Sequence, residues 1–377
     1  MEITTALMYE DTNSSHFWNV SYLEEYEDFS NFINVTRILI PVLFGLITIL
    51  GLFGNVLTIA VILLHKAIRG ITKYPIMNLA IADLLYIIFC VPFKAIYPVL
   101  NFWPCGDTFC RIHTYLEYVC YFASMYILVL VSLDRYIALV HPIKAIILRT
   151  KRNCKILLVA LWTLTILGNI PFLFMAKEVN LNPESIDERG KVCSVHFECA
   201  SSSYICLFVF SYMLPLILLC VLYGHMLKVF LTGKTPIAHN SGGHIRLQAK
   251  KRVTKMVILV VSVFAVCWMP LQIIMLYSHV TMNEHITVTF ASIIYAAKCM
   301  AYMNSCINPI LYTFYTHTFR NGIKNMICCR KTIDSKHSSY SSVKRASYSS
   351  VKRASYSSAN RASISSVKRA SYSSAIA

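Results

Sequence analysis

The chain has 377 residues, of which 56% are hydrophobic and only 14% are charged. Soluble globular domains carry about 25% charged residues, so this composition argues against a soluble protein and for one membrane-embedded bundle. The net charge of +17 does not indicate a nucleic-acid partner, because Lys and Arg lie in short loops and in the tail rather than in a basic folded domain.

The first 36 residues are polar, with seven acids and no Lys or Arg. A cleavable signal peptide would begin with a basic stretch and an apolar core, so the first apolar run is expected to direct membrane insertion itself. Three N-glycosylation sequons begin here, at Asn13, Asn19 and Asn34.

Seven apolar segments follow, each near or above the roughly 20 residues that span a bilayer. All are expected to be helices, because lipid offers the backbone no other hydrogen-bond partner within one segment. The segments lie at 38–64, 75–100, 110–140, 155–174, 203–230, 253–279 and 286–315. Membrane helices tolerate proline as kinks, which we expect at Pro92, Pro171, Pro215, Pro270 and Pro309.

The loops give the expected orientation. Basic residues gather at 66–73, 144–155, 234–255 and in the tail, whereas acids gather at the N-terminus and in the loop 175–202. By the positive-inside rule the N-terminus lies outside and the C-terminus inside, which agrees with the sequons.

Four cysteines lie on the expected outer side, where oxidation is favoured. Cys110 and Cys193 can be joined, which would tie the loop 175–202 across the mouth of the bundle. Cys105 and Cys199 form a possible second pair; free thiols or exchanged partners stay open, since sequence does not give connectivity.

The tail repeats an eight-residue unit four times between 341 and 372, without apolar content for a core, and is expected to be disordered. Each copy carries a Ser two residues after Arg, a candidate phosphorylation site: Ser347, Ser355, Ser363 and Ser371. Neutral expansion of the repeat, or contact with the anionic inner leaflet, explains the pattern equally well.

Polar side chains interrupt the apolar helices. Asp83 lies in the middle of the second segment, where an unpaired carboxylate would cost several kcal/mol. We therefore expect it to face inward toward Asn55, Ser124, Asn304 and Asn308, although a purely structural polar cluster is the alternative.

These features resemble the rhodopsin-like G-protein-coupled receptors over about residues 37–330. The motifs that carry the resemblance are Gly54-Asn55, Leu79-Ala-Ile-Ala-Asp83, Asp134-Arg135-Tyr136, Trp162, Pro215 with Tyr223, Cys267-Trp268-Met269-Pro270 and Asn308-Pro309-Ile-Leu-Tyr312. The resemblance implies a ligand-operated switch rather than an enzyme: ligand binding favours a state in which the sixth helix moves outward.

The resemblance also implies roles for individual residues. G-protein coupling would use Asp134, Arg135, Tyr136, Tyr223 and Tyr312. The activation switch would comprise Phe264, Trp268, Pro270, Asn308 and Pro309. Asp83, Ser124, Asn304 and Asn308 would hold an allosteric sodium ion, and no other cofactor is expected. The acid that some members carry at the foot of the sixth helix is replaced by Lys250, which predicts a higher basal activity.

The implied organisation has four parts: an extracellular glycosylated segment (1–36), the transmembrane domain (37–316), an amphipathic eighth helix (317–330) and a disordered cytoplasmic tail (331–377). Cys328 and Cys329 would be palmitoylated. The implied location is the plasma membrane, with membrane lipid around the bundle and with arrestin and receptor kinases acting on the tail.

The ligand pocket would include Glu117, Gln272, Lys298 and Tyr302. Tyr302 occupies the position of the opsin lysine, which argues against retinal, and Glu117 stands where amine receptors carry Asp. Glu117 could pair with a ligand cation or internally with Lys298; both readings stay open.

Three stretches are similar to the allatostatin-A and galanin receptor group: Phe102–Asp107, Met125–Pro142 and Cys267–Ile274. A neuropeptide ligand is therefore expected, and the acidic outer segments would attract a basic peptide. Somatostatin- or kisspeptin-type peptides, or a small amine, are the alternatives. A transporter or channel is disfavoured, because internal repeats of the spans and a pore loop are missing.

Overall fold

The structure is a computed structural model that describes residues 20–64, 70–180, 190–195, 205–232, 243–281, 287–315 and 317–327. The chain divides into two units, Met1–Ile323 and Lys324–Ala377. The first unit is a bundle of helices with one small β-hairpin. Of the second unit, only residues 324–327 are described.

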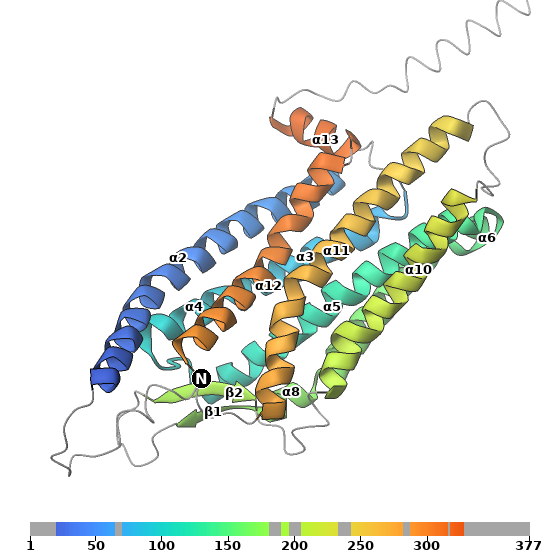
Figure 1. Ribbon diagram of the computed structural model, residues 1–377. Helices are drawn as coiled ribbons and strands as arrows, with labels where there is room; N and C mark the ends of the chain where they lie inside the picture. Colours follow the sequence, from blue (N-terminus) through green and yellow to red (C-terminus); the bar gives the residue numbers. More distant parts are fainter. Residues whose placement is uncertain are drawn as a thin grey trace, which may run out of the picture. The chain divides into compact units, whose positions relative to one another are not determined.

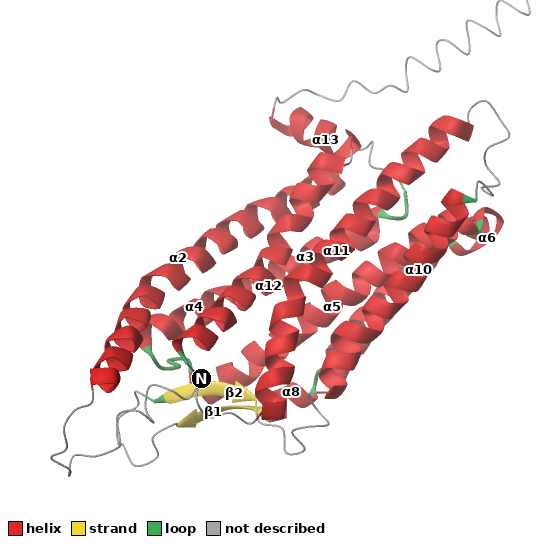
Figure 2. Ribbon diagram, viewed as in Figure 1, coloured by secondary structure: helices red, strands yellow, loops and turns green. Residues whose placement is uncertain are grey.

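Long helices run alongside one another through the bundle (Figures 1 and 2). In chain order the helices are α2 (Val20–Leu64), α3 (Lys73–Phe89), α4 (Val91–Leu100), α5 (Gly106–Val140), α6 (Pro142–Leu148), α7 (Lys151–Gly168), α8 (Pro171–Met175), the π-helix η1 (Val209–Met213), α10 (Leu214–Leu231), α11 (Gly243–Thr281), α12 (Val288–Tyr315) and α13 (His317–Ile327). A helix is therefore present at each of the seven predicted segments.

Six of the described helical segments are long and apolar enough to cross a membrane. The seventh member of the bundle, α12, carries Lys298, Asn304 and Asn308 along its length, which lowers its hydropathy. Large apolar side chains such as Ile49 and Phe53 on α2 are about two-thirds exposed on the outside of the bundle (66% and 71%). Such a surface is stable against lipid rather than water. The chain is a multi-pass membrane protein.

The first and sixth helices begin earlier than expected. α2 begins at Val20, so part of the N-terminal segment is helical, and α11 begins at Gly243 rather than at residue 253. The sequon at Asn34 lies on α2, where the Thr36 hydroxyl donates to the carbonyl of Phe32 (2.9 Å). The other two sequons lie outside the described residues, as do Cys328, Cys329 and the repeats of the tail.

Prolines interrupt two of the predicted spans. The second span is divided between α3 and α4 at Cys90, and Pro92 occupies the first turn of α4. The fourth ends at Gly168, after which Pro171 begins α8. Proline is favoured in the first turn because its missing N–H is not needed there. Pro270 and Pro309 instead lie inside the continuous helices α11 and α12.

α2 and α12 approach closely. A Cβ atom at Gly54 would lie only 3.0 Å from the ring of Pro309, so glycine lets the two helices approach without displacing that ring. Asn55 uses the approach to donate to the carbonyl of Ser305 (2.9 Å). The Gly-Asn pair of the first span is thereby explained as a packing device between two helices.

The loop 175–202 contains an antiparallel hairpin that the sequence did not predict. β1 (Ala176–Asn180) pairs with β2 (Lys191–Val195), with Glu178 opposite Cys193. The hairpin lies across one end of the bundle, here called the hairpin end, and α6 lies at the opposite end (Figure 1). α5 contacts α3, α7, α10 and both strands, which makes it the central helix.

Candidate functional site

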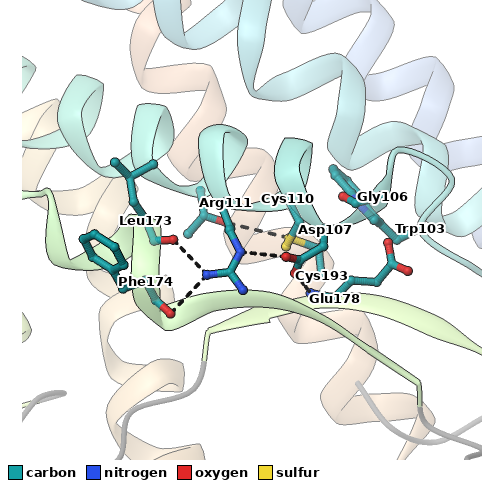
Figure 3. A network of polar contacts seen from close by, with 10 residues as sticks. Trp103, Gly106, Asp107, Cys110, Arg111, Leu173, Phe174, Glu178 and Cys193 are labelled. Carbon is teal, nitrogen blue, oxygen red and sulfur yellow. Dashed lines mark hydrogen bonds and ion pairs between the residues drawn. A yellow bond between two sulfur atoms is a disulfide. The ribbon is translucent and has the colours of Figure 1, made fainter.

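The hairpin is fixed to the start of α5 by a disulfide and a polar network (Figure 3). The predicted bond between Cys110 and Cys193 is confirmed, with its Cα atoms 5.5 Å apart. Cys105 instead carries a free thiol whose pKa is raised by partial burial, and Cys199 lies outside the described residues.

Arg111 is the central residue of this network. Its Nε donates to Asp107 Oδ2 (2.7 Å), and its Nη1 donates to the Leu173 carbonyl in α8 (3.1 Å). Asp107 also accepts from the backbone N–H of Glu178 in β1 (2.9 Å). One guanidinium and one carboxylate thus join α5, α8 and β1, as Figure 3 shows.

A cavity of about 430 Å³ lies near the hairpin, within the size range of small-molecule sites. All four residues predicted for the ligand pocket line it: Glu117, Gln272, Lys298 and Tyr302. Cys193 and Val195 of β2 line it too, and so does Trp268 of α11. The hairpin therefore contributes directly to the wall of the cavity.

The internal partner of Glu117 is Lys94 rather than Lys298. Lys94 Nζ lies 3.0 Å from Glu117 Oε2, and both side chains are less than one-third exposed. Sequence analysis overlooked Lys94 because it was counted only as part of an apolar span. The signal available in the sequence was Pro92, because proline favours the first turn of a helix, and α4 does begin one residue before it.

A chain of hydrogen bonds starts at the cavity wall. Gln272 of α11 donates to the Tyr121 hydroxyl (2.9 Å), which donates to the carbonyl of Ser211 in η1 (3.1 Å). The ring of Tyr121 also packs on Trp268, with centroids 4.1 Å apart. The predicted switch residue Trp268 is thus held by an α5 residue that the sequence had not singled out.

Of the other predicted switch residues, Phe264 precedes Trp268 by about one turn of α11 and Pro270 follows it, whereas Asn308 and Pro309 lie on α12. Phe264 packs against Trp268, with ring centroids 6.0 Å apart. Tyr212 of η1 donates to the Ala265 carbonyl (2.8 Å), next to the turn where Pro270 cannot donate its own backbone hydrogen bond. η1, α11 and α5 therefore meet near the predicted hinge.

Asp83 is buried in the middle of the bundle and accepts three hydrogen bonds. They come from Ser124 Oγ (3.2 Å), Ser305 Oγ (3.0 Å) and Asn308 Nδ2 (2.9 Å). Ser124 and Asn308 were predicted partners. Ser305 donates to Asp83 where Asn304 had been expected to do so. The face of α12 that contacts Asp83 is therefore one residue further along the helix than predicted.

Three amide oxygens near this cluster have no hydrogen-bond partner among the described residues, although they are buried: those of Asn55, Asn304 and Asn308. Buried unpaired oxygens are costly. Together with a carboxylate they form the all-oxygen donor set that hard cations prefer. The residues present therefore fit a small cation such as sodium.

At the far end of α5, Asp134 is held chiefly by Arg149, which sequence analysis had not selected. Arg149 Nε and Nη2 bind the two carboxylate oxygens of Asp134 (2.7 and 3.0 Å), and Thr72 Oγ1 donates to Oδ2 (2.9 Å). Arg135 Nε is 3.9 Å from the same carboxylate. The expected pair of Asp134 with Arg135 is thus a loose contact beside a bidentate one.

Of the remaining residues predicted for G-protein coupling, Tyr136 and Tyr223 contact the α5–α10 interface and Tyr312 does not. The Ser132 hydroxyl donates to Leu128, so Tyr223 of α10 donates to Ser132 across a gap of 2.6 Å. Tyr136 contacts Nδ1 of His225 in α10 (2.9 Å). Tyr312 of α12 is buried and packs instead on Phe319 of α13, with ring centroids 6.2 Å apart.

Comparison with known proteins gives a family for this arrangement. The family described as 7 transmembrane receptor (rhodopsin family) matches residues 54–312. An allatostatin-A receptor of Bombyx mori is 37% identical over 324 residues, which cover 83% of this chain and 86% of that relative. Galanin receptor 2b of Danio rerio is 32% identical over 85% of this chain and 82% of its own length.

Galanin receptor type 2 of Homo sapiens is 33% identical over 77% of this chain and 73% of that relative. The matched family region contains the cavity, the Asp83 cluster and the Asp134 end. The chain therefore belongs to the rhodopsin family of seven-transmembrane receptors.

Proposed function

We propose that the protein is a plasma-membrane receptor for a neuropeptide of the allatostatin-A or galanin type, and that it activates a heterotrimeric G protein. The observation that carries this proposal is the position of two sites on one helix. α5 places Glu117 in the cavity and Arg135 at the opposite end, about 27 Å apart at 1.5 Å per residue.

The hairpin end would face outward and the Arg135 end would face the cytoplasm. The disulfide supports this orientation, since such bonds form in oxidising compartments. Lys73, Lys144 and Arg149 lie at the opposite end, with Asp134, which agrees with the positive-inside rule. G-protein contact through Arg135 follows from the same orientation, and the tail would then be available to receptor kinases and arrestin.

Ligand binding would act through Trp268. Its ring lines the cavity and packs on Tyr121. The hydroxyl of Tyr121 accepts from Gln272 of α11 and donates to the Ser211 carbonyl in η1. A ligand that displaces one of these side chains would weaken the contacts that hold the part of α11 preceding Pro270. It would change the equilibrium only by its difference in affinity for the two states.

The Asp83 cluster would bind sodium in the inactive state. When bound, the ion supplies a positive charge that offsets the buried carboxylate. Asp83 and Ser124 would hold it, with the unpaired amide oxygens of Asn304 and Asn308 as further donors. Asn55 would position α12 through the Ser305 carbonyl.

A peptide ligand fits the cavity better than a small amine does. An amine would need Glu117 as its counter-ion, but that carboxylate is already paired with Lys94 (3.0 Å). The cavity of about 430 Å³ has room for one end of a peptide and leaves the remainder for the hairpin and the acidic N-terminal segment.

The test is a nucleotide-exchange assay with the full chain in lipid nanodiscs, purified heterotrimeric G proteins and a panel of neuropeptides. Allatostatin-A-like or galanin-like peptides should accelerate exchange, while aminergic agonists should not. Activation by an amine and by none of these peptides would refute the assignment of the ligand class.

A further inference from the structure

Two cavities adjoin at the hairpin end and share part of their walls. The larger is the ligand cavity of about 430 Å³ described above, and the smaller has a volume of about 190 Å³. Lys94, Cys193 and Lys298 line both of them. These three side chains therefore form part of the boundary between the two spaces.

Lys94 reaches from this boundary to Glu117, which lines the larger cavity. Its Nζ lies 3.0 Å from Glu117 Oε2, and the two side chains are 31% and 22% exposed. The ion pair thus joins α4 to α5 at the edge of the ligand cavity. An ion pair that solvent still reaches is weak, so a modest competing interaction is enough to break it.

The backbone that carries Lys94 is held in place. Its N–H donates to the carbonyl of Cys90 at the break between α3 and α4 (3.3 Å), and Nε2 of His113 in α5 lies 3.4 Å from the same carbonyl. The first turn of α4 is therefore tied to α5. The long Lys94 side chain can still rotate away from Glu117 and extend toward solvent, which requires no movement of either helix.

The smaller cavity is suited to an aromatic side chain. Its volume is below the range of complete small-molecule sites, so it has room for one side chain of a larger ligand. The ammonium of Lys298 lies 5.7 Å from the ring centroid of Tyr295, and a further ring in the cavity could share this cation–π contact. The rings that line the cavity would pack against an incoming ring: Phe44, Phe93, Tyr97, Trp103, His113 and Tyr295.

We propose that the ion pair of Lys94 and Glu117 is a gate between the two cavities, and that the smaller cavity receives an aromatic side chain of the peptide when the gate opens. The inference rests on the proposed function and gives the peptide two points of attachment. A closed gate lowers affinity, because a ligand binds more weakly when its competent state is only partly populated. Removing the ion pair should therefore tighten the binding of an aromatic ligand.

Binding of small fragments tests the gate without requiring activation. The probe is N-acetylphenylalaninamide, which is neutral and carries one ring, titrated by saturation-transfer NMR on the full chain in nanodiscs. Lys94→Gln and Glu117→Gln should each bind it about fivefold more tightly than the wild type does. N-acetylalaninamide, which lacks the ring, should show no gain. Unchanged affinity for the aromatic probe in both variants would overturn the proposal.

Exchanging the two charges separates the ion pair from the individual side chains. The double variant Lys94→Glu with Glu117→Lys restores the pair in reverse and should return the affinity to that of the wild type. Lys177→Gln is the matched control, because this lysine is exposed on β1 and is not among the described residues that line either cavity. A double variant that keeps the fivefold gain would contradict the gate.

Filling the smaller cavity tests where the ring binds. Val192 of β2 lines this cavity, so Val192→Phe in the Lys94→Gln background should remove the gain and leave wild-type affinity. Ser194→Phe fills the same cavity from the same strand and replaces it if thermal unfolding shows that Val192→Phe is not folded. A gain that persists in the folded double variant would show that the ring binds elsewhere.

The outcomes distinguish the gate from the receptor assignment. If the fragments behave as expected but no neuropeptide activates the protein, the proposed function fails and the gate stands. If a neuropeptide activates it but neither Lys94→Gln nor Glu117→Gln changes the affinity for the aromatic probe, the gate fails and the receptor assignment stands.

Discussion

Near the end of α5, Asp134 is held by a side chain from outside the helix rather than by its neighbour in the motif. Asp134 is bound by Arg149 at 2.7 Å, and Arg135 is left with a contact of 3.9 Å. A bidentate guanidinium–carboxylate pair is stronger than a single long contact. Arg135 therefore has only a weak ionic contact with Asp134 in this state. This contact and the Lys250 that replaces an acid are two reasons to expect basal activity.

Replacing Arg149 with Ala should lower ligand-free nucleotide exchange. Without its bidentate partner, Asp134 keeps Arg135 as its nearest cation and should hold it more tightly. A twofold or larger decrease in exchange rate is expected, measured with purified G protein at equal receptor concentration. Lys151→Ala is the control, since Lys151 is exposed at the start of α7. A rise in basal exchange would show that Arg149 restrains the receptor instead.

At Asp83, Ser305→Ala should destabilise the protein more than Asn304→Ala does. Ser305 donates to the buried carboxylate (3.0 Å), and losing a hydrogen bond to a charged group costs about 1.5–3 kcal/mol. The amide oxygen of Asn304 has no partner among the described residues, so its removal leaves no bond broken there. Thermal unfolding in sodium-free lipid nanodiscs measures both, and the reverse order would contradict the observed contacts.

At the scale of helices and strands, polar contacts to the cavity side of α5 come from places where neighbouring helices are interrupted. α4 begins after the break at Cys90, and this segment carries Lys94 to Glu117. η1 precedes Pro215 and receives the hydrogen bond from Tyr121. π-Helical turns are frequent at functional sites because they re-aim side chains within a helix. The hairpin, which separates α8 from η1, is anchored by the Cys110–Cys193 disulfide and by Asp107 and Arg111.

Arg111→Ala should loosen the hairpin without breaking the disulfide. Amide hydrogen exchange in residues 176–180 and 191–195 should become faster, and peptide affinity should fall about tenfold because β2 lines the cavity. Arg111→Lys keeps the charge but not the forked geometry that reaches Asp107 and Leu173 together. It should show an intermediate effect, and unchanged exchange in both variants would mean that Cys110–Cys193 alone holds the hairpin.

On the scale of the whole molecule, α5 is the element that links the cavity to the Arg135 end. It contacts α3, α7, α10, α11 and both strands. A rearrangement of these neighbours can therefore alter both the cavity and the Arg135 end. Asp83 lies between the two ends and joins α3 to α5 and α12. Interiors packed in this way respond by shifting between discrete arrangements rather than by continuous deformation.

Coupling between the two ends is expected to be reciprocal. A peptide that promotes G-protein binding must itself bind more tightly when the G protein is present, by the same factor. Arg135→Ala should abolish this increase while changing peptide affinity without G protein less than about threefold. Competition binding with and without nucleotide-free G protein measures both quantities. A persistent increase in the variant would place the coupling contact elsewhere.

Several features of the fold followed directly from the sequence. Seven apolar segments predicted the bundle, because a span in lipid must satisfy its own backbone. The Cys110–Cys193 bond was anticipated among four cysteines on the expected outer side. Asp83 was expected to face Ser124 and Asn308, since a carboxylate in lipid needs partners. The sequence was less reliable at the ends of helices, such as Val20 and Gly243, because turns beyond the apolar stretch are set by packing and capping.

The sequence by itself determined the class of protein, the spans and the chemical types gathered in each site. Only the tertiary structure decided which polar group meets which: Lys94 rather than Lys298 for Glu117, and Arg149 rather than Arg135 for Asp134. Hydropathy depends on residue type alone, whereas an ion pair depends on the rotation of each helix and on breaks such as the one at Cys90. A rotation of one residue, about 100°, is enough to exchange Asn304 for Ser305 beside Asp83.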